Sequence, residues 1–93
     1  MTKIRVFVVD DHTILRDGLR ALIEVQPDLC VVGEAADGDV ALTGVAETQP
    51  DVVVMDISMP RLGGADATEQ IRRACPQVRV LALTAHENGE YVQ

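Results

Sequence analysis

Aromatic side chains are almost absent from this sequence. Phe7 and Tyr91 make up the 2% aromatic content, whereas 47% of the 93 residues are hydrophobic. The core must therefore be aliphatic, and the aromatic platforms that bind single-stranded nucleic acids are not expected. Positive charge is also scarce, because 8 Lys and Arg face 15 Asp and Glu, for a formal net charge of -7. A phosphate backbone would be repelled, so we do not expect this segment to bind DNA or RNA directly.

The sequence also lacks the patterns of several common sites. Cys30 and Cys75 form no Cys-x-x-Cys pair and histidine is scarce, so we expect two reduced thiols in apolar surroundings and neither a disulfide framework nor a zinc site. Neither G-x-x-x-x-G-K-[ST] nor G-x-G-x-x-G is present, which argues against a nucleotide-binding module. There is no signal peptide and no long apolar span. We therefore expect a cytoplasmic protein without membrane contact.

Apolar runs of strand length alternate with amphipathic stretches of helix length. The expected strands are Ile4–Val9, Leu29–Gly33, Val52–Met55 and Val78–Leu83. The expected helices run from Ile14 to Ile23 after a cap at Thr13 or Asp11, from Asp37-Gly38-Asp39 with an interruption at Gly44, and through Ala67, Ile71 and Ala74. This alternation predicts one α/β domain, with a parallel sheet and helices on both of its faces.

The last part of the pattern is incomplete. Val78–Leu83 would form an exposed apolar sheet edge, and the helical pattern of His86–Gln93 barely begins. Because exposed edges recruit partners, we expect either a segment of a longer protein or a chain that completes itself with another copy. Completion with another copy would give either a homodimer or a strand-swapped assembly.

Carboxylates follow two of the expected strands. Asp10 and Asp11 come directly after Ile4–Val9, and Asp56 comes directly after Val52–Met55. Each is typical of turn and cap chemistry when taken alone. If the two strands are parallel neighbours, however, all three carboxylates converge at the sheet edge, in loops, where open α/β sheets bind ligands. Clustered carboxylates repel one another, and a hard divalent cation such as Mg²⁺ relieves that repulsion.

Two further polar residues lie near this expected edge. Thr84 follows the fourth expected strand, so its hydroxyl could donate to a phosphate oxygen held beside Asp56. His12 follows the acidic pair, and we interpret it as a polar loop residue near a helix N-cap, in preference to a metal ligand or base.

Three segments together resemble the receiver domain of two-component response regulators. They are Val8-Val9-Asp10-Asp11-His12, Met55-Asp56-Ile57-Ser58-Met59-Pro60 and Leu81-Ala82-Leu83-Thr84-Ala85. Val31-Val32-Gly33-Glu34-Ala35 resembles the NarL/FixJ-type subgroup, whose members carry a C-terminal helix-turn-helix domain. The resemblance implies a flavodoxin-like (CheY-like) doubly wound sheet, incomplete at about four strands. Residues 1–93 would be the N-terminal part of the receiver, and the DNA-binding domain is absent from this chain.

The resemblance also implies roles for individual residues. Asp56 would accept a phosphoryl group from a sensor histidine kinase. Mg²⁺ would be held by Asp11, by Asp10 through water, by Asp56 and by the Ser58 backbone carbonyl. Thr84 would be the switch hydroxyl. The domain would switch an output, expected to be transcription, and would be no enzyme beyond self-phosphorylation and slow autodephosphorylation.

The sequence departs from the family pattern at two places. It ends before the fifth strand, whose lysine pairs with the phosphate, and Gly63 stands where the family often has Asp or Asn. One alternative is therefore a receiver-like scaffold that is not phosphorylated in this form. A Mg²⁺-dependent phosphohydrolase is a second alternative, but such enzymes use Asp-x-Asp, whereas Asp10 and Asp11 are adjacent.

Overall fold

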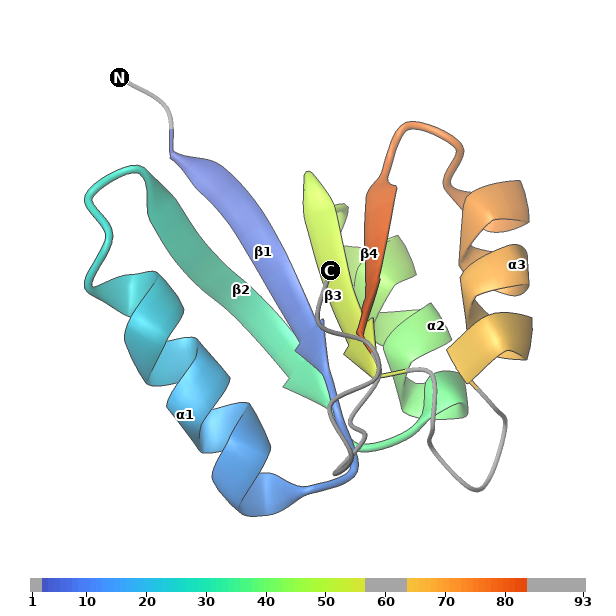
Figure 1. Cartoon of the computed structure of the whole chain (residues 1–93). Coiled ribbons are helices and arrows are strands. Elements are labelled where there is room, and N and C mark those ends of the chain that lie inside the picture. The colour runs from blue at the N-terminus through green and yellow to red at the C-terminus, as the bar shows by residue number, and fades with distance from the viewer. Residues whose placement is uncertain (1–2, 57–63, 84–93) are drawn as a thin grey trace.

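Four apolar segments form one parallel sheet in the computed structural model, which describes residues 3–56 and 64–83 (Figure 1). The strands are β1 (Ile4–Val9), β2 (Leu29–Ala35), β3 (Val52–Asp56) and β4 (Arg79–Leu83), in the order β2-β1-β3-β4. Every neighbouring pair is parallel. The predicted α/β architecture is confirmed, and β1 lies beside β3 as the convergence of the carboxylates requires.

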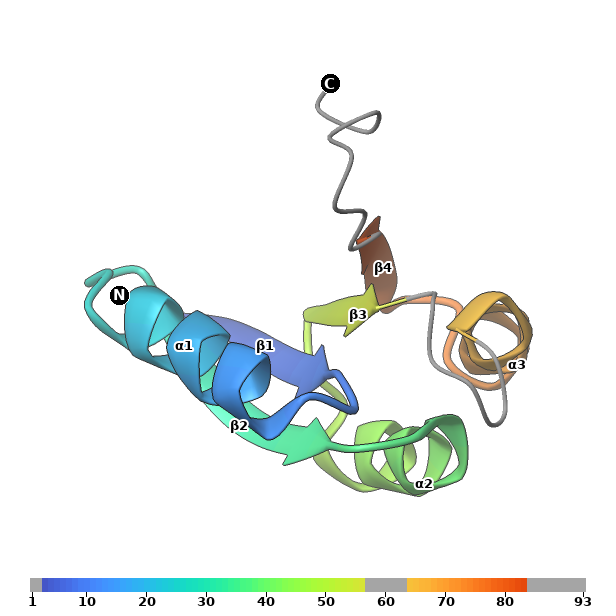
Figure 2. The ribbon, with the colours of Figure 1, turned by 60° about the horizontal axis from the view of Figure 1, so that its bottom comes forward.

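Helices cover both faces of this sheet, as predicted. They are α1 (Thr13–Glu24), α2 (Gly38–Thr48) and α3 (Gly64–Ala74). Figure 2 looks along the sheet and shows α1 on one side, with α2 and α3 together on the other. Among the described residues, no helix is both long enough and apolar enough to cross a membrane.

The hydrophobic core lies between the sheet and the α2–α3 pair. Strand residues Phe7, Val9, Val53 and Met55 pack against four helix residues, of which two are alanines: Ala41, Val45, Ala67 and Ile71. Because alanine side chains are short, they let the helices approach the sheet closely. Cys75 is buried in this cluster and Cys30 is half-buried, and neither forms a disulfide. The core is aliphatic apart from Phe7, as predicted, and it contains Cys75 but not Cys30.

Phe7 packs between two glycines. A Cβ added at Gly33 would lie 2.6 Å from Phe7 Cε2, and one added at Gly44 would lie 2.6 Å from Phe7 Cζ. Gly44 was expected to interrupt a weak helix, yet α2 runs through it. The glycine costs about 1 kcal/mol relative to alanine in helix propensity, but it leaves the space that the phenyl ring occupies.

Several boundaries differ from those predicted. The N-cap of α1 is His12, with no side-chain cap hydrogen bond, so the prediction of Thr13 or Asp11 was wrong. β2 continues to Ala35 instead of ending at Gly33, and it carries a register shift opposite Val6 and Phe7. β4 begins at Arg79, one residue later than expected.

Other boundaries agree with the sequence. Asp37 is the N-cap of α2, where its side chain accepts a hydrogen bond from Val40 N. Arg72 and Arg73 lie in the last turn of α3. The predictions of a switch hydroxyl at Thr84 and of a helix from His86 to Gln93 concern residues outside the described ranges.

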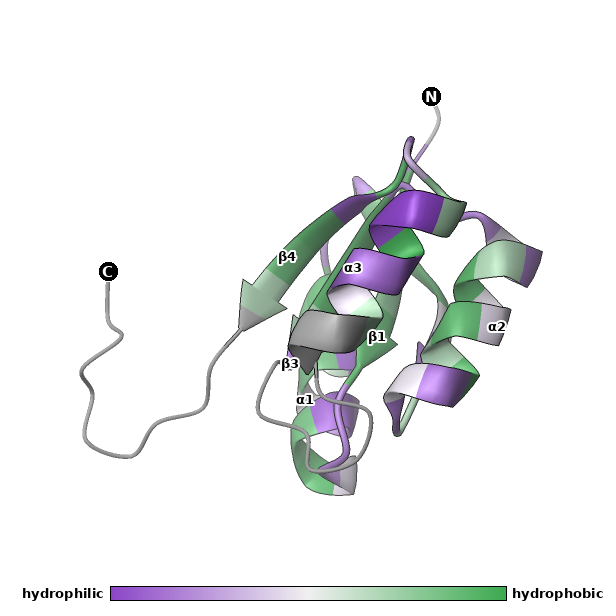
Figure 3. Cartoon of the chain, turned by 90° about the vertical axis from the view of Figure 1, so that its right-hand side faces the viewer, coloured by the Kyte–Doolittle hydropathy of each residue, from purple (hydrophilic) through white to green (hydrophobic). Residues whose placement is uncertain are grey.

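The apolar side of α1 is exposed. This helix has the predicted amphipathic spacing, but none of its residues is buried, and Ile14 and Leu22 are 88% and 67% exposed. β4 forms one edge of the sheet, where Leu81 is 57% exposed. Figure 3 shows hydrophobic colouring along this strand. Within the described residues, the predicted apolar sheet edge is therefore confirmed.

Candidate functional site

Asp10 and Asp56 lie at the carboxyl ends of two neighbouring strands. Val9 is paired with Met55 in the parallel register of β1 and β3, so the next residue along each strand reaches the same edge. Both carboxyl residues are buried, with exposures of 1% for Asp10 and 2% for Asp56. The prediction that Asp56 lies in a loop outside the core was wrong, because it is the last residue of β3 and pairs with Leu83.

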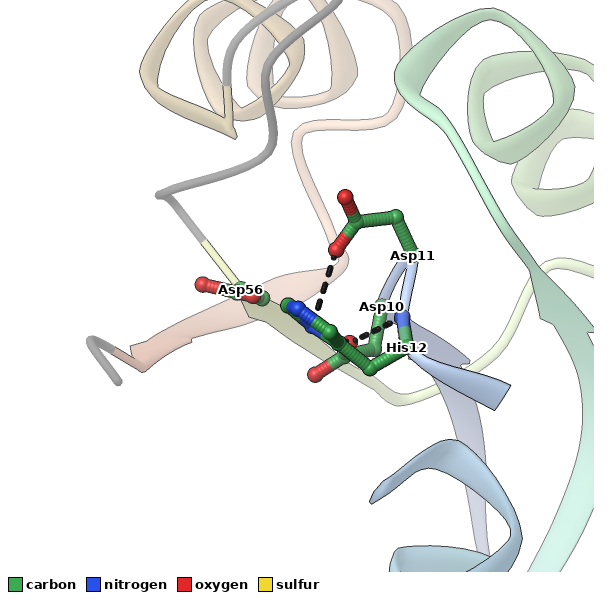
Figure 4. A group of neighbouring side chains, drawn as sticks. All are labelled: Asp10, Asp11, His12 and Asp56. Carbon is green, nitrogen blue, oxygen red and sulfur yellow. Dashed lines mark hydrogen bonds and ion pairs between the residues drawn. The ribbon is translucent and has the colours of Figure 1, made fainter. Parts of the chain in front are cut away.

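Asp11 and His12 complete a cluster with these two residues (Figure 4). One potential ligand atom from each of the four residues lies within 4.8 Å of the corresponding atoms of the others. Asp11 is half-buried and His12 is exposed. The sequence analysis predicted that Asp10, Asp11 and Asp56 would converge, and the structure brings them together. Ser58 and Thr84 lie outside the described residues.

His12 contacts both members of the acidic pair. Its backbone N–H donates to Asp10 Oδ1 at 2.7 Å. Its ring Nδ1 lies 3.1 Å from Asp10 Oδ1 and 3.0 Å from Asp11 Oδ1 (Figure 4). The interpretation of His12 as a polar residue at the helix cap is confirmed, but its ring contacts were not foreseen. The hydrogen bond with Asp10 and the charge of Asp11 raise the pKa of His12 above its usual value.

The arrangement suits a hard cation. Three carboxylates approach one another at an edge where two of them are buried. Burial of like charges is costly unless a cation compensates them. Carboxylate oxygens are the donors that Mg²⁺ prefers, and Mg²⁺ commonly keeps several waters beside one or two carboxylates. The donor set of Asp10, Asp11 and Asp56 therefore fits Mg²⁺.

An ion-pair network adjoins the acidic cluster at the backbone of Asp10. Arg16 of α1 donates through Nε to Glu34 Oε1 at 2.7 Å, and through Nη1 to the backbone carbonyl of Asp10 at 2.6 Å. Arg20 Nη1 donates to Glu34 Oε2 at 2.7 Å. Sequence reasoning missed this network, because Glu34 is far from both arginines along the chain. The hint that the sequence offered was the i, i+4 spacing of Arg16 and Arg20, which places both arginines on one face of the helix.

Comparison with known proteins identifies the family of this fold and site. Residues 6–93 match the response regulator receiver domain. The chain is 43% identical over 89 residues to the transcriptional regulatory protein LiaR of Bacillus subtilis (strain 168), covering 96% of this chain and 42% of that protein. It is 37% identical over 90 residues to the transcriptional regulatory protein DegU of Brevibacillus brevis, covering 97% of this chain and 38% of that protein. The chain thus spans about two-fifths of the length of these curated relatives.

Solved structures agree with this result. A two-component response regulator of the LuxR family from Aurantimonas sp. SI85-9A1 superimposes with a TM-score of 0.86 at 45% identity, covering 92% of this chain and 61% of that one. The receiver domain of the putative response regulator NarL from Mycobacterium tuberculosis gives a TM-score of 0.86 at 37% identity, covering 94% and 70%. Sequence match, fold and acidic edge lead to one conclusion: this chain belongs to the receiver domain family of two-component response regulators.

Proposed function

We propose that the acidic cluster is a Mg²⁺-dependent phosphoacceptor site and that Asp56 accepts the phosphoryl group. The observation that carries this proposal is the convergence of Asp10, Asp11 and Asp56 at the carboxyl edge of β1 and β3, with ligand atoms within 4.8 Å of one another. Asp10 and Asp11 hold the cation together with Asp56. We retain the Ser58 carbonyl as a further ligand and Thr84 as the switch hydroxyl on the basis of the family resemblance.

The chemistry is phosphoryl transfer to a carboxylate. A carboxylate oxygen of Asp56 attacks phosphorus in line, a P–O bond forms, and the P–N bond of a kinase phosphohistidine breaks. The histidine nitrogen keeps the electron pair of the broken bond. A bound Mg²⁺ supplies neutralisation of the charge that develops on the phosphoryl oxygens. Burial of Asp56 limits its contact with water, and water later hydrolyses the acyl phosphate to reset the site.

The proposal includes the wider protein. The phosphodonor is a sensor histidine kinase, and the output is transcription, through a DNA-binding domain outside this chain. Two features support this reading: the curated relatives are transcriptional regulatory proteins, and the net charge of -7 makes this segment itself unsuited to DNA. Residues 1–93 are then the N-terminal part of a cytoplasmic receiver, which signals rather than turning over a substrate.

Intact-mass spectrometry with an acyl phosphate donor and Mg²⁺ tests the acceptor. The wild type is expected to gain one phosphoryl group, and Asp56→Asn to gain none, because an amide is not a nucleophile for this transfer. Asp17→Asn, which removes an exposed carboxyl group from α1, is the matched control and should react as the wild type does. Modification of Asp56→Asn, or reaction of the wild type in excess chelator, would contradict the proposal. Absence of reaction in the wild type would favour a scaffold role.

Metal binding is tested separately by calorimetric titration with Mg²⁺. Asp10→Asn and Asp11→Asn should each weaken binding by about tenfold or more, because even indirect partners of metal ligands commonly contribute about 10–100-fold. Asp17→Asn should leave the dissociation constant unchanged. Equal affinity in all four proteins would remove Asp10 and Asp11 from the site.

A further inference from the structure

Arg16 is the residue that connects α1 to the acidic edge. Its side chain is only 16% exposed although it carries a charge. Its guanidinium group divides its donors between the Glu34 carboxylate on β2 and the Asp10 backbone carbonyl at the end of β1. A planar guanidinium group suits this task, because its donors are fixed relative to one another.

The Asp10 carbonyl belongs to the peptide group that joins Asp10 to Asp11. A peptide group is planar, so a bond to its oxygen fixes the rotation of the whole plane. The Asp10 N–H is held independently by the carbonyl of Ala35 at 3.1 Å. Asp10 is thus held through both its N–H and its C=O, and the bond from Arg16 acts on the peptide plane from which the Asp11 backbone continues.

Glu34 keeps Arg16 in place. The other carboxylate oxygen of Glu34 accepts a hydrogen bond from Arg20, whose side chain is 47% exposed; among the described hydrogen bonds and ion pairs, Arg20 makes none with Asp10. Arg16 and Arg20 therefore share one anchor and carry the same charge. They differ in one contact, the hydrogen bond from Arg16 to the peptide group between the two aspartates.

We propose that Arg16 is a positioning residue of the acidic site, which orients the peptide plane between Asp10 and Asp11 so that both carboxylates meet Asp56. This inference rests on the proposed Mg²⁺ site. It makes a prediction whose sign is opposite to that of simple electrostatics. Loss of a nearby cation makes an acidic site more negative and would tighten Mg²⁺ binding, whereas loss of orientation weakens it.

The test compares Arg16→Ala, Arg16→Lys and Arg20→Ala in the full chain, with Mg²⁺ affinity measured by calorimetry. Arg16→Ala should raise the dissociation constant by about tenfold or more. Arg20→Ala should stay within about twofold of the wild type, because exposed ion pairs contribute little. Arg16→Lys should fall between them, since one ammonium nitrogen replaces the two donors of the fork. Binding by Arg16→Ala as tight as the wild type, or tighter, would overturn the inference.

A metal-free readout separates this inference from the proposed function. The ¹⁵N shift of the Asp11 amide, which shares its peptide group with the Asp10 carbonyl, should change in Arg16→Ala and not in Arg20→Ala, measured in excess chelator. If the wild type fails to bind Mg²⁺, the proposed function is wrong, and an Asp11 shift that is insensitive to Arg16 shows that the positioning role is wrong too. If Arg16→Ala does not fold, Arg16→Lys replaces it, and equality with Arg20→Ala in both measurements overturns the inference.

Discussion

The two faces of the sheet are held by different kinds of interaction. On one face, α2 and α3 pack on Phe7, Val53 and Met55, and the contacts are close and apolar. On the other face, Val6 and Val8 of β1 are buried, but no residue of α1 itself is. The described ion pairs of α1 with the sheet are those of Arg16 and Arg20 with Glu34. An amphipathic pattern therefore identifies a helix and its apolar side without telling how far that side is covered. The face with the weaker packing is also the one that carries the ion-pair network to the acidic site.

The largest expected contrast comes from isoleucines on the two faces. Ile71→Ala on α3 should lower the free energy of unfolding by about 2–5 kcal/mol, because Ile71 has no exposed surface and its truncation leaves a cavity. Ile14→Ala on α1 should change it by no more than about 0.5 kcal/mol, because this side chain is 88% exposed. Urea unfolding of both variants gives the comparison. Similar losses would show that the α1 face is packed in solution.

A second contrast uses two glycines inside helices. Gly44→Ala should destabilise the protein by about 1–3 kcal/mol, since the new methyl group would overlap the Phe7 ring. Gly18→Ala in α1 should stabilise it by up to about 1 kcal/mol, because nothing lies within 4 Å of its new methyl group and alanine favours helix. Thermal unfolding measures both. Stabilisation by Gly44→Ala would mean that Phe7 moves aside at little cost.

The smallest expected effect is on the pKa of His12, the N-cap residue of α1. Because its pKa is raised in the folded state, its contribution to stability is present below its unfolded pKa and is lost as pH rises through the folded pKa. NMR titration without metal should give a His12 pKa above about 6.5, its ordinary value, and Asp10→Asn should lower it. Asp17→Asn is the control. An unchanged His12 pKa in Asp10→Asn would show that the ring does not contact Asp10 in solution.

The sequence sufficed for the elements and for the acidic cluster. Strand and helix periods are local signals, and carboxylates placed after two parallel strands reach one edge whatever the details of packing. That is why Asp10, Asp11 and Asp56 were predicted to converge. Burial of Asp56 was not foreseen, because β3 continues one residue beyond its apolar run and pairs there with β4.

The features that the sequence missed depend on contacts between distant residues. The presence of glycine at position 44 is explained only once the Phe7 ring is known to lie against α2. Glu34 becomes the partner of Arg16 only if its side chain lies on the face of β2 that α1 covers. The periodicity of the sequence does not predict which face that is. His12 replaced Thr13 and Asp11 as the N-cap, because cap preference is a small energy that tertiary contacts override.

The register shift between β1 and β2 explains which way Glu34 points. Val6 pairs with Val31 and Phe7 pairs with Gly33, so one residue of β2 is extra at this point. Side chains alternate along a strand, and one extra residue exchanges the faces of all that follow. A regular strand would place Val31 and Glu34, which are three residues apart, on opposite faces, and the extra residue places them on the same face. Deleting Val32 would leave Phe7 opposite Gly33 and Val8 opposite Glu34 in an unbroken register, so Glu34 would still face Arg16. A residue inserted between Gly33 and Glu34 would instead turn Glu34 toward the apolar core and leave Arg16 without its carboxylate.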